Sequence, residues 1–212
     1  MKRLSLIFIL FLSLSFLYAK EITVSVGAGQ HWKEKREPQF AVWLEDSDGN
    51  FIKTIYVTER ASHKSWIMSP KEGRPESLPV WYHASKHESS KTKKQDAKDS
   101  QLDAVTSATP KGGIIFNAEI EDKEYYIRAE FNTSFDYNDY YTKKNSGVNG
   151  QPSVIYSAKI PADFNNESDE IKLSFDDGCG SIDGADGKVH SDVSNLTTAT
   201  EIVKLIAVKA VR

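Results

Sequence analysis

The sequence predicts an all-β protein built as an antiparallel sandwich, and three observations lead to this prediction. Apolar and polar side chains alternate in at least five segments, with the period of a strand that has one buried face. Turn-forming residues separate these segments at short intervals. No stretch of the chain shows the apolar spacing of an amphipathic helix of ordinary length.

The first predicted hairpin joins residues 40–44 to residues 51–58, and a separate strand over 22–26 precedes it. Residues 22–26 alternate between β-branched apolar and hydroxyl side chains, and Phe40, Val42 and Leu44 share one face of the next segment. The turn residues 47–50 follow, and the β-branched and aromatic run 51–58 returns as the partner strand.

A second hairpin is predicted from the clearest alternation in the chain. Residues 114–120 form its first strand and residues 125–131 its second, joined through Asp122 and Lys123. We expect Phe116 and Ile127 to be buried in the core.

Three further strands complete the series. They are expected over 154–160, over 171–175 and over 202–211, and a short helix over 198–204 is an alternative near the C-terminus. Short strands in series with polar turns favour an immunoglobulin-like sandwich with long loops.

Three segments do not read as strands. Residues 84–101 have almost no apolar content and are predicted to be a mobile polar loop. Residues 132–152 carry aromatic side chains among Asn and Asp, and residues 176–192 are rich in Asp and Gly.

The N-terminus has the form of a secretory signal peptide. Two positive charges at Lys2 and Arg3 precede the apolar run 4–17, and Ala19 is the small residue before the expected cleavage point. A retained anchor is the alternative, but the run is shorter than a membrane span and no later segment is apolar enough to be a stable one. We therefore expect a signal peptide over 1–19 and a single domain over 20–212, located in the periplasm or outside the cell.

Charge and cysteine content exclude several classes of protein. Residues 1–19 carry two positive charges and no negative one, so cleavage moves the formal net charge from −3 to −5. An acidic chain is a poor ligand for nucleic acid. The single Cys179 cannot form a disulfide within the chain.

No pattern in the chain predicts a catalytic or metal site. His83 and His87 have helical metal-ligand spacing, but their neighbours do not look helical. The Asp-rich residues 176–192 lack the ligand spacing of a helix-loop-helix calcium site, so a solvated loop is favoured. We therefore expect no metal and assign no catalytic residue. A non-enzymatic protein is favoured, and an enzyme is left open as a third option for which no specific reaction is indicated.

The segment Asp103-Ala104-Val105-Thr106-Ser107-Ala108-Thr109-Pro110 carries the only chemical signal. It resembles the motif Asp-x-x-Ser/Thr-Gly-Ala-Thr that flavin transferases recognise, in which the final Thr accepts the FMN phosphate. The resemblance implies Thr109 as acceptor, with Asp103, Thr106 and Ser107 in the recognition sequence. Ser107 stands where the motif usually has Gly. The alternative is a turn in which Asp103 and Thr106 cap backbone amides.

The chain also resembles a family of periplasmic domains of unknown function that are associated with flavin transferases and membrane-bound reductase-like proteins. The segments that carry this resemblance are Phe40–Asp46, Leu78–Tyr82, Asp103–Pro110 and Asp183–Lys188. It implies electron transfer outside the cytoplasm, with a flavin transferase and a membrane redox protein as partners. Cys179 stands where the family is expected to have His, which argues against a metal ligand there.

These observations predict an exported, non-enzymatic module associated with redox chemistry, which either carries a covalent FMN or assists a flavinylated electron-transfer partner. The alternative is a cofactor-free binding or structural module that recruits a protein or a glycan through the aromatic residues 135–141.

Overall fold

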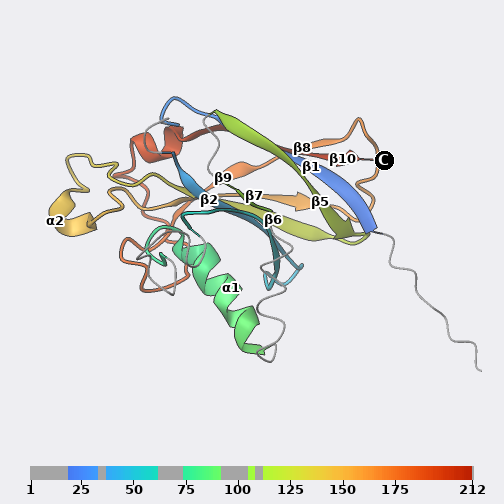
Figure 1. The fold of residues 1–212 in the computed structure, drawn as a ribbon, viewed down its shortest axis with the longest axis horizontal. Helices are drawn as coiled ribbons and strands as arrows, with labels where there is room; N and C mark the ends of the chain where they lie inside the picture. Colours follow the sequence, from blue (N-terminus) through green and yellow to red (C-terminus); the bar gives the residue numbers. More distant parts are fainter. Residues whose placement is uncertain (1–18, 33–36, 62–73, 92–104, 108–111, 212) are drawn as a thin grey trace, which may run out of the picture.

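The computed structural model describes residues 19–32, 37–61, 74–91, 105–107 and 112–211, of which 86–91 and 105–107 are described by their backbone alone. These residues form two sheets that pack face to face (Figure 1). The β-sandwich expected from the sequence is confirmed.

The smaller sheet has four antiparallel strands. Their order is β5 (Gly113–Glu121), β1 (Ala19–Ala28), β10 (Val203–Val211) and β8 (Glu170–Lys172). The first and last strands of the domain, β1 and β10, therefore pair in its centre.

The larger sheet has six strands. Their order is β4 (Val105–Ser107), β3 (Phe51–Thr58), β2 (Gln39–Glu45), β6 (Tyr125–Asn132), β7 (Val154–Ile160) and β9 (Ser174–Cys179). All neighbours are antiparallel except β3 and β4, which run parallel. The described residues also form three helical elements: α1 (Pro79–Lys91), α2 (Lys143–Ser146) and the 3-10 helix η2 (Thr198–Glu201).

Aromatic rings form the centre of the core between the sheets. Phe40 is fully buried, and its ring stacks on Tyr56 and on Phe131 with centroid separations of 4.9 Å each. Phe116 stacks on the other side of Tyr56 at 4.8 Å. Phe116 and Ile127 are both buried, as the alternation predicts.

Two predicted strand arrangements are wrong. β2 and β3 do form the first expected hairpin, but β5 pairs with β1 while β6 pairs with β2 and β7, so 114–120 and 125–131 form no hairpin. The predicted single strand 171–175 is also divided, because β8 joins the small sheet and β9 the large one. In both places the chain crosses from the small sheet to the large one. Apolar and polar side chains alternate in the same way in two strands that pair within a sheet and in two strands that face each other across the core, so the pattern does not identify the partner. At the C-terminus the 3-10 helix and the strand are both present.

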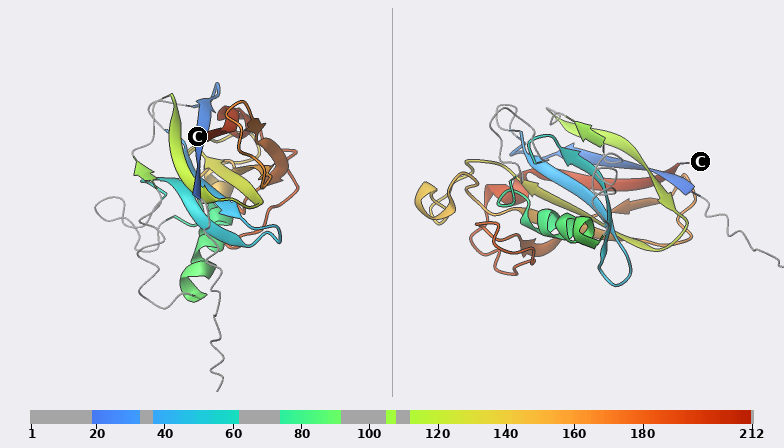
Figure 2. Two further views of the ribbon diagram at one scale, coloured as in Figure 1. Left: turned by 90° about the vertical axis from the view of Figure 1, so that its right-hand side faces the viewer. Right: turned by 60° about the horizontal axis from the view of Figure 1, so that its bottom comes forward.

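The helix α1 is the main departure from the prediction. It spans 13 residues and includes 84–91, which the sequence assigned to a mobile loop, while 92–101 lie outside the described residues. Its apolar side chains all lie in its first turn, so no helical period is visible. Figure 2 (right) shows α1 lying across the outer face of the six-stranded sheet. Within the described ranges, no helix is long and apolar enough to cross a membrane.

The outer face of the large sheet explains why β2 is buried on both sides. Ala41 and Trp43 point away from the sandwich core and pack with Val80 and Trp81 of α1. A strand covered on both faces reads as a continuous apolar run, as Phe40 to Leu44 does.

One pair of isoleucines tests the assignment of faces. Ile127 is fully buried in β6, whereas Ile115 in β5 is 72% exposed. We expect Ile127→Ala to lower the free energy of unfolding by about 2–5 kcal/mol and Ile115→Ala to change it by less than about 0.5 kcal/mol. Urea unfolding of both variants checks this, and equal losses would mean that the faces are assigned wrongly.

Candidate functional site

Part of the flavin-motif segment forms the outer strand of the six-stranded sheet. Thr106 and Ser107 lie in β4, where their backbones pair with Val57 and Thr58 of β3. β4 is the end of the sheet in the described chain, so it has a neighbour on one side only. The alternative interpretation of this segment as a turn is therefore wrong over 105–107, which form a short edge strand.

Two of the predicted site residues lie outside the described residues, namely Asp103 and Thr109.

Other segments of the family resemblance meet around α1. Leu78–Tyr82 forms the start of α1, and it packs on Phe40–Asp46 through the apolar cluster of the outer face. Asp183–Lys188 lies against the same helix, because Nε2 of His83 donates a 2.9 Å hydrogen bond to the carbonyl oxygen of Gly184. The Trp81 indole donates a 2.8 Å hydrogen bond to Oγ1 of Thr54 in β3, the strand that pairs with β4.

A buried carboxylate holds the start of α1 in place. Leu78, before the first helical residue, has no side-chain acceptor for the free N–H groups of the first turn. Glu130 of β6 supplies one: its carboxylate accepts from the backbone N–H of Val80 at 3.2 Å and of Trp81 at 2.8 Å. The Ser153 hydroxyl donates a third hydrogen bond at 2.6 Å.

Burial governs the protonation of this carboxylate. Glu130 has no solvent-accessible surface. Desolvation raises its pKa to about 7, although the hydrogen bonds from Ser153, Trp81 and Val80 act in the opposite direction. Gly180 closes the site, since a Cβ there would collide with Pro79 and with the Ser153 hydroxyl.

The raised pKa predicts a loss of stability with rising pH. An unfolded Glu ionises near pKa 4.5, whereas folded Glu130 keeps its proton to about 7. The folded state therefore binds the extra proton within this window, and its stability falls as pH rises through it, by on the order of 3 kcal/mol. Unfolding of wild type and Glu130→Gln at about pH 5 and about pH 8 measures this contribution. We expect the wild type to lose stability relative to the variant, and a pH-independent difference would contradict the assignment.

A cavity of about 520 Å³ opens where the aromatic and Asp-rich segments meet. Tyr140 and Tyr141 line it on one side and Cys179 lies at the end of β9. Ile182 and Pro152 also line it, and its polar lining residues are Asn145, Ser181, Asp183, Asp186, His190 and Asp192. Nothing in the sequence pattern indicates that the aromatic and the Asp-rich segments are neighbours, and the fold brings them together.

The surroundings of Cys179 disfavour nucleophilic chemistry at its thiol. Burial, and then the Asp192 carboxylate, raise the pKa of the Cys179 thiol, which disfavours the reactive thiolate. Nε2 of His190 lies 3.0 Å from Oδ1 of Asp186. Among the described residues, no three His, Cys, Asp or Glu side chains are placed to hold a metal ion.

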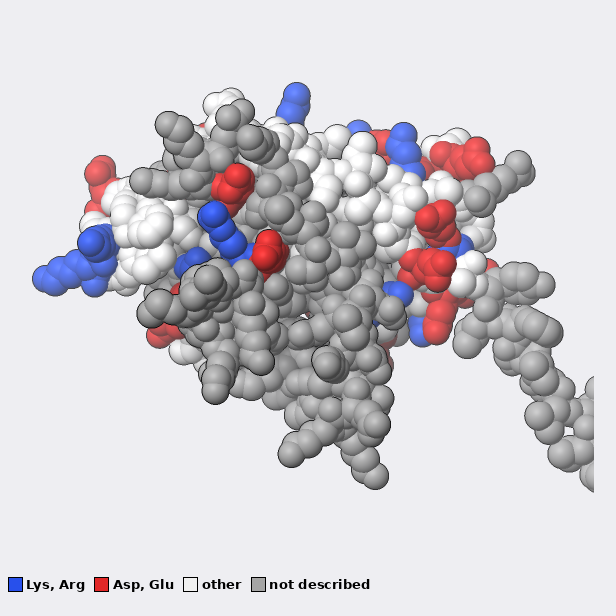
Figure 3. Space-filling view, in the orientation of Figure 1, with Lys and Arg blue, Asp and Glu red and all other residues white. Residues whose placement is uncertain are grey.

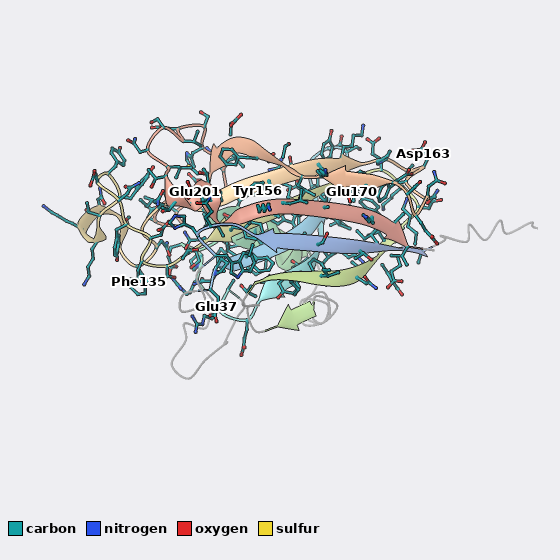
Figure 4. The ribbon with its side chains drawn as sticks, turned by 90° about the horizontal axis from the view of Figure 1, so that it is seen from above. Glu37, Phe135, Tyr156, Asp163, Glu170 and Glu201 are labelled. Carbon is teal, nitrogen blue, oxygen red and sulfur yellow. The ribbon has the colours of Figure 1, made fainter. Side chains whose placement is uncertain are left out.

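The aromatic segment is displayed rather than packed. Phe135, Tyr137 and Tyr140 are 46%, 36% and 56% exposed. Figure 4 shows Phe135 at one end of the sandwich, far from Asp163 at the other. Exposed aromatic side chains are typical of interaction surfaces.

The sequence pattern does not predict a role for Glu130, the buried carboxylate that holds the start of α1. Its only signal is a carboxylate between apolar Ala129 and Phe131 in a strand that has both faces covered. This signal can be interpreted only if α1 is known to cover the outer face of the sheet, and the apolar pattern does not predict α1. No family model, curated protein or solved structure matches this chain.

Proposed function

We propose that the protein is an exported, non-enzymatic redox module, periplasmic or extracellular, that carries FMN on Thr109 or assists a flavinylated electron-transfer partner. Its partners in this proposal are a flavin transferase and a membrane redox protein. The proposal rests on the motif resemblance of Asp103–Pro110 and on one structural observation: Val105–Ser107 is the edge strand of the larger sheet.

An edge strand suits a substrate that another enzyme must modify. Its outer backbone groups have no strand neighbour among the described residues, so a transferase can approach the segment from that side. The parallel pairing with β3 fixes Thr106 and Ser107 at one end of the acceptor segment.

The chemistry requires an activated flavin donor. The Thr109 oxygen would attack the flavin-side phosphorus of a flavin dinucleotide, the hydroxyl proton would pass to a base of the transferase, and the nucleotide monophosphate would leave. The product is an FMN phosphodiester, and the flavin supplies the electron chemistry while the protein supplies its surroundings.

A second candidate, the cofactor-free binding module, is favoured by the cavity and the exposed Tyr140 beside it. Carboxylates and tyrosines around one opening suit a hydroxyl-rich ligand such as a glycan, or a protein segment. The cavity lies at β9 and the flavin segment at β4, at opposite edges of the sheet. Five strand spacings, about 24 Å, separate them, so each can be tested alone.

The discriminating experiment is co-expression with an active flavin transferase in the export compartment. We expect a protein band that fluoresces after denaturation, because the flavin bond is covalent. Ser107→Gly restores the commoner motif and should label as well or better. A Ser107→Gly protein that stays dark, beside a labelled control substrate, would make the binding module the leading account.

A further inference from the structure

Three exposed apolar side chains meet at the end of the sandwich, and we call them the apolar tip: Phe135, Tyr137 and Val148. The rings of Phe135 and Tyr137 have a centroid separation of 6.4 Å, and the Phe135 N–H donates a 2.7 Å hydrogen bond to the Val148 carbonyl oxygen. Val148 is 48% exposed. The tip holds three of the seven large exposed hydrophobic side chains in the described chain.

The tip is held by a rigid polar base. Asp136, next to Phe135, is buried and accepts hydrogen bonds from Gln151 at 2.9 Å and from Thr198 at 2.6 Å. Gly150 has a φ of +77°, and a Cβ there would collide with the backbone of Asp136. These contacts keep the Asp136 side chain buried and leave the side chains of Phe135 and Tyr137 exposed.

The backbone of Phe135 is held in an unfavourable conformation. Its φ of +62° lies in the left-handed region, which bulky residues rarely occupy. The result is a large apolar ring in solvent. Such strain is retained where the display of a side chain has a use.

Two lysines flank the tip. Lys143 and Lys144 are exposed on α2, which ends at Gly147 beside Val148. Residues 140–151 contain no acidic side chain. Close to them in sequence, Asp136 is buried and Asp139 is exposed, and Asp183, Asp186 and Asp192 line the cavity that Asn145 of α2 also lines. In Figure 3 basic side chains protrude at the end where Figure 1 labels α2, with an acidic side chain close by.

The geometry favours a lipid surface over a sugar. Phe135 and Tyr137 meet at 69°, so they present no flat platform on which a sugar ring could stack. Aromatic and aliphatic side chains beside lysines are the composition that enters the interface of a bilayer, where rings lie at the headgroup level and lysines pair with anionic lipids.

We propose that the apolar tip and the lysines of α2 dock the protein reversibly on an anionic lipid bilayer. This inference is independent of Thr109, since the tip and β4 lie on different elements. It would place an exported redox or binding module at the surface where a membrane partner resides. The strand β1 begins at the end of the sandwich opposite to the tip (Figure 1). A leader retained in the same membrane would hold that opposite end at the bilayer, so docking by the tip requires a processed N-terminus.

Sedimentation with vesicles tests this proposal on the protein purified after export and processing. We expect binding to vesicles of phosphatidylcholine mixed with phosphatidylglycerol, weakened by salt, and weaker binding to phosphatidylcholine alone. Phe135→Ala with Val148→Ser should lower binding to both by about tenfold or more. Lys143→Gln with Lys144→Gln should lower only the anionic component, by about fivefold for each lysine.

Matched controls lie on the smaller sheet, in β5, β8 and β10. Ile115→Ala removes the most exposed apolar side chain of the described residues, and Lys172→Gln with Lys209→Gln removes two exposed lysines. These variants should bind vesicles like wild type. Wild-type protein that binds no vesicles, or tip variants that bind as well as wild type, would overturn the proposal. Tip-dependent binding to a membrane protein in detergent, without vesicle binding, would assign the tip to a protein instead.

Discussion

Thr109→Ala, co-expressed with an active flavin transferase, is expected to leave the export compartment without any covalent flavin. The substitution removes the only hydroxyl that the motif resemblance assigns as acceptor, so the loss of label should be complete rather than partial. Fluorescence of the denatured band measures the label. We expect circular dichroism and urea unfolding of this variant to match those of the wild type, so that the loss of label is separated from a loss of folding.

Thr106→Ala is the matched control for this loss. Thr106 belongs to the same segment and contributes a backbone to β4, but in the proposal it serves recognition only. It should retain at least part of the label. Equal loss in both variants would show that the segment is needed as a whole without identifying the acceptor, and full labelling of Thr109→Ala would place the flavin elsewhere.

Phe40→Ala is expected to lower the free energy of unfolding by about 3–5 kcal/mol. Phe40 is fully buried, and it joins Tyr56 and Phe131 in one stack at the centre of the sandwich. Its removal leaves a cavity and also breaks two ring contacts. Because small domains are stable by about 5–15 kcal/mol, this loss is a large part of the total. Urea unfolding of the purified variant measures it.

Phe135→Ala is the control for the same chemical change at an exposed site. Its ring is 46% exposed, so the expected loss is below about 1 kcal/mol. This result would also show that Phe135→Ala, one of the two changes in the tip variant used with vesicles, leaves the protein folded. A Phe40→Ala loss as small as that of Phe135→Ala would contradict the position of Phe40 in the core.

Alternation predicted the strands well and their partners poorly. Residues 22–26 and 114–120 are strands because one face of each meets the core, and the alternation of their side chains indicates which face is buried. Residues 40–44 also form a strand, but both of its faces are buried. Pairing depends on which sheet a strand joins. The pattern of 125–131 is the same whether it pairs with β5 or lies opposite to it.

The helix α1 shows a different limit. Its stability comes from outside the segment, through Glu130 at its first turn and through Trp81 against β3. Local propensity cannot report such tertiary contacts. A signal for it does exist in β2, where Ala41 and Trp43 make the outward face apolar and therefore require a cover.

The site divides in the same way. The motif segment was visible in sequence because it is short and contiguous, and its place at a sheet edge required the structure. The cavity joins Tyr140, Cys179 and His190 from distant parts of the chain, so no local pattern could predict it.

The intact mass of wild-type protein, co-expressed with a flavin transferase and purified after export, tests the central claim most directly. The account predicts the mass of the chain from Lys20 plus that of FMN less one water, with the added mass on the peptide that contains Thr109. A chain of unmodified mass, from cells in which the transferase labels another substrate, would contradict it.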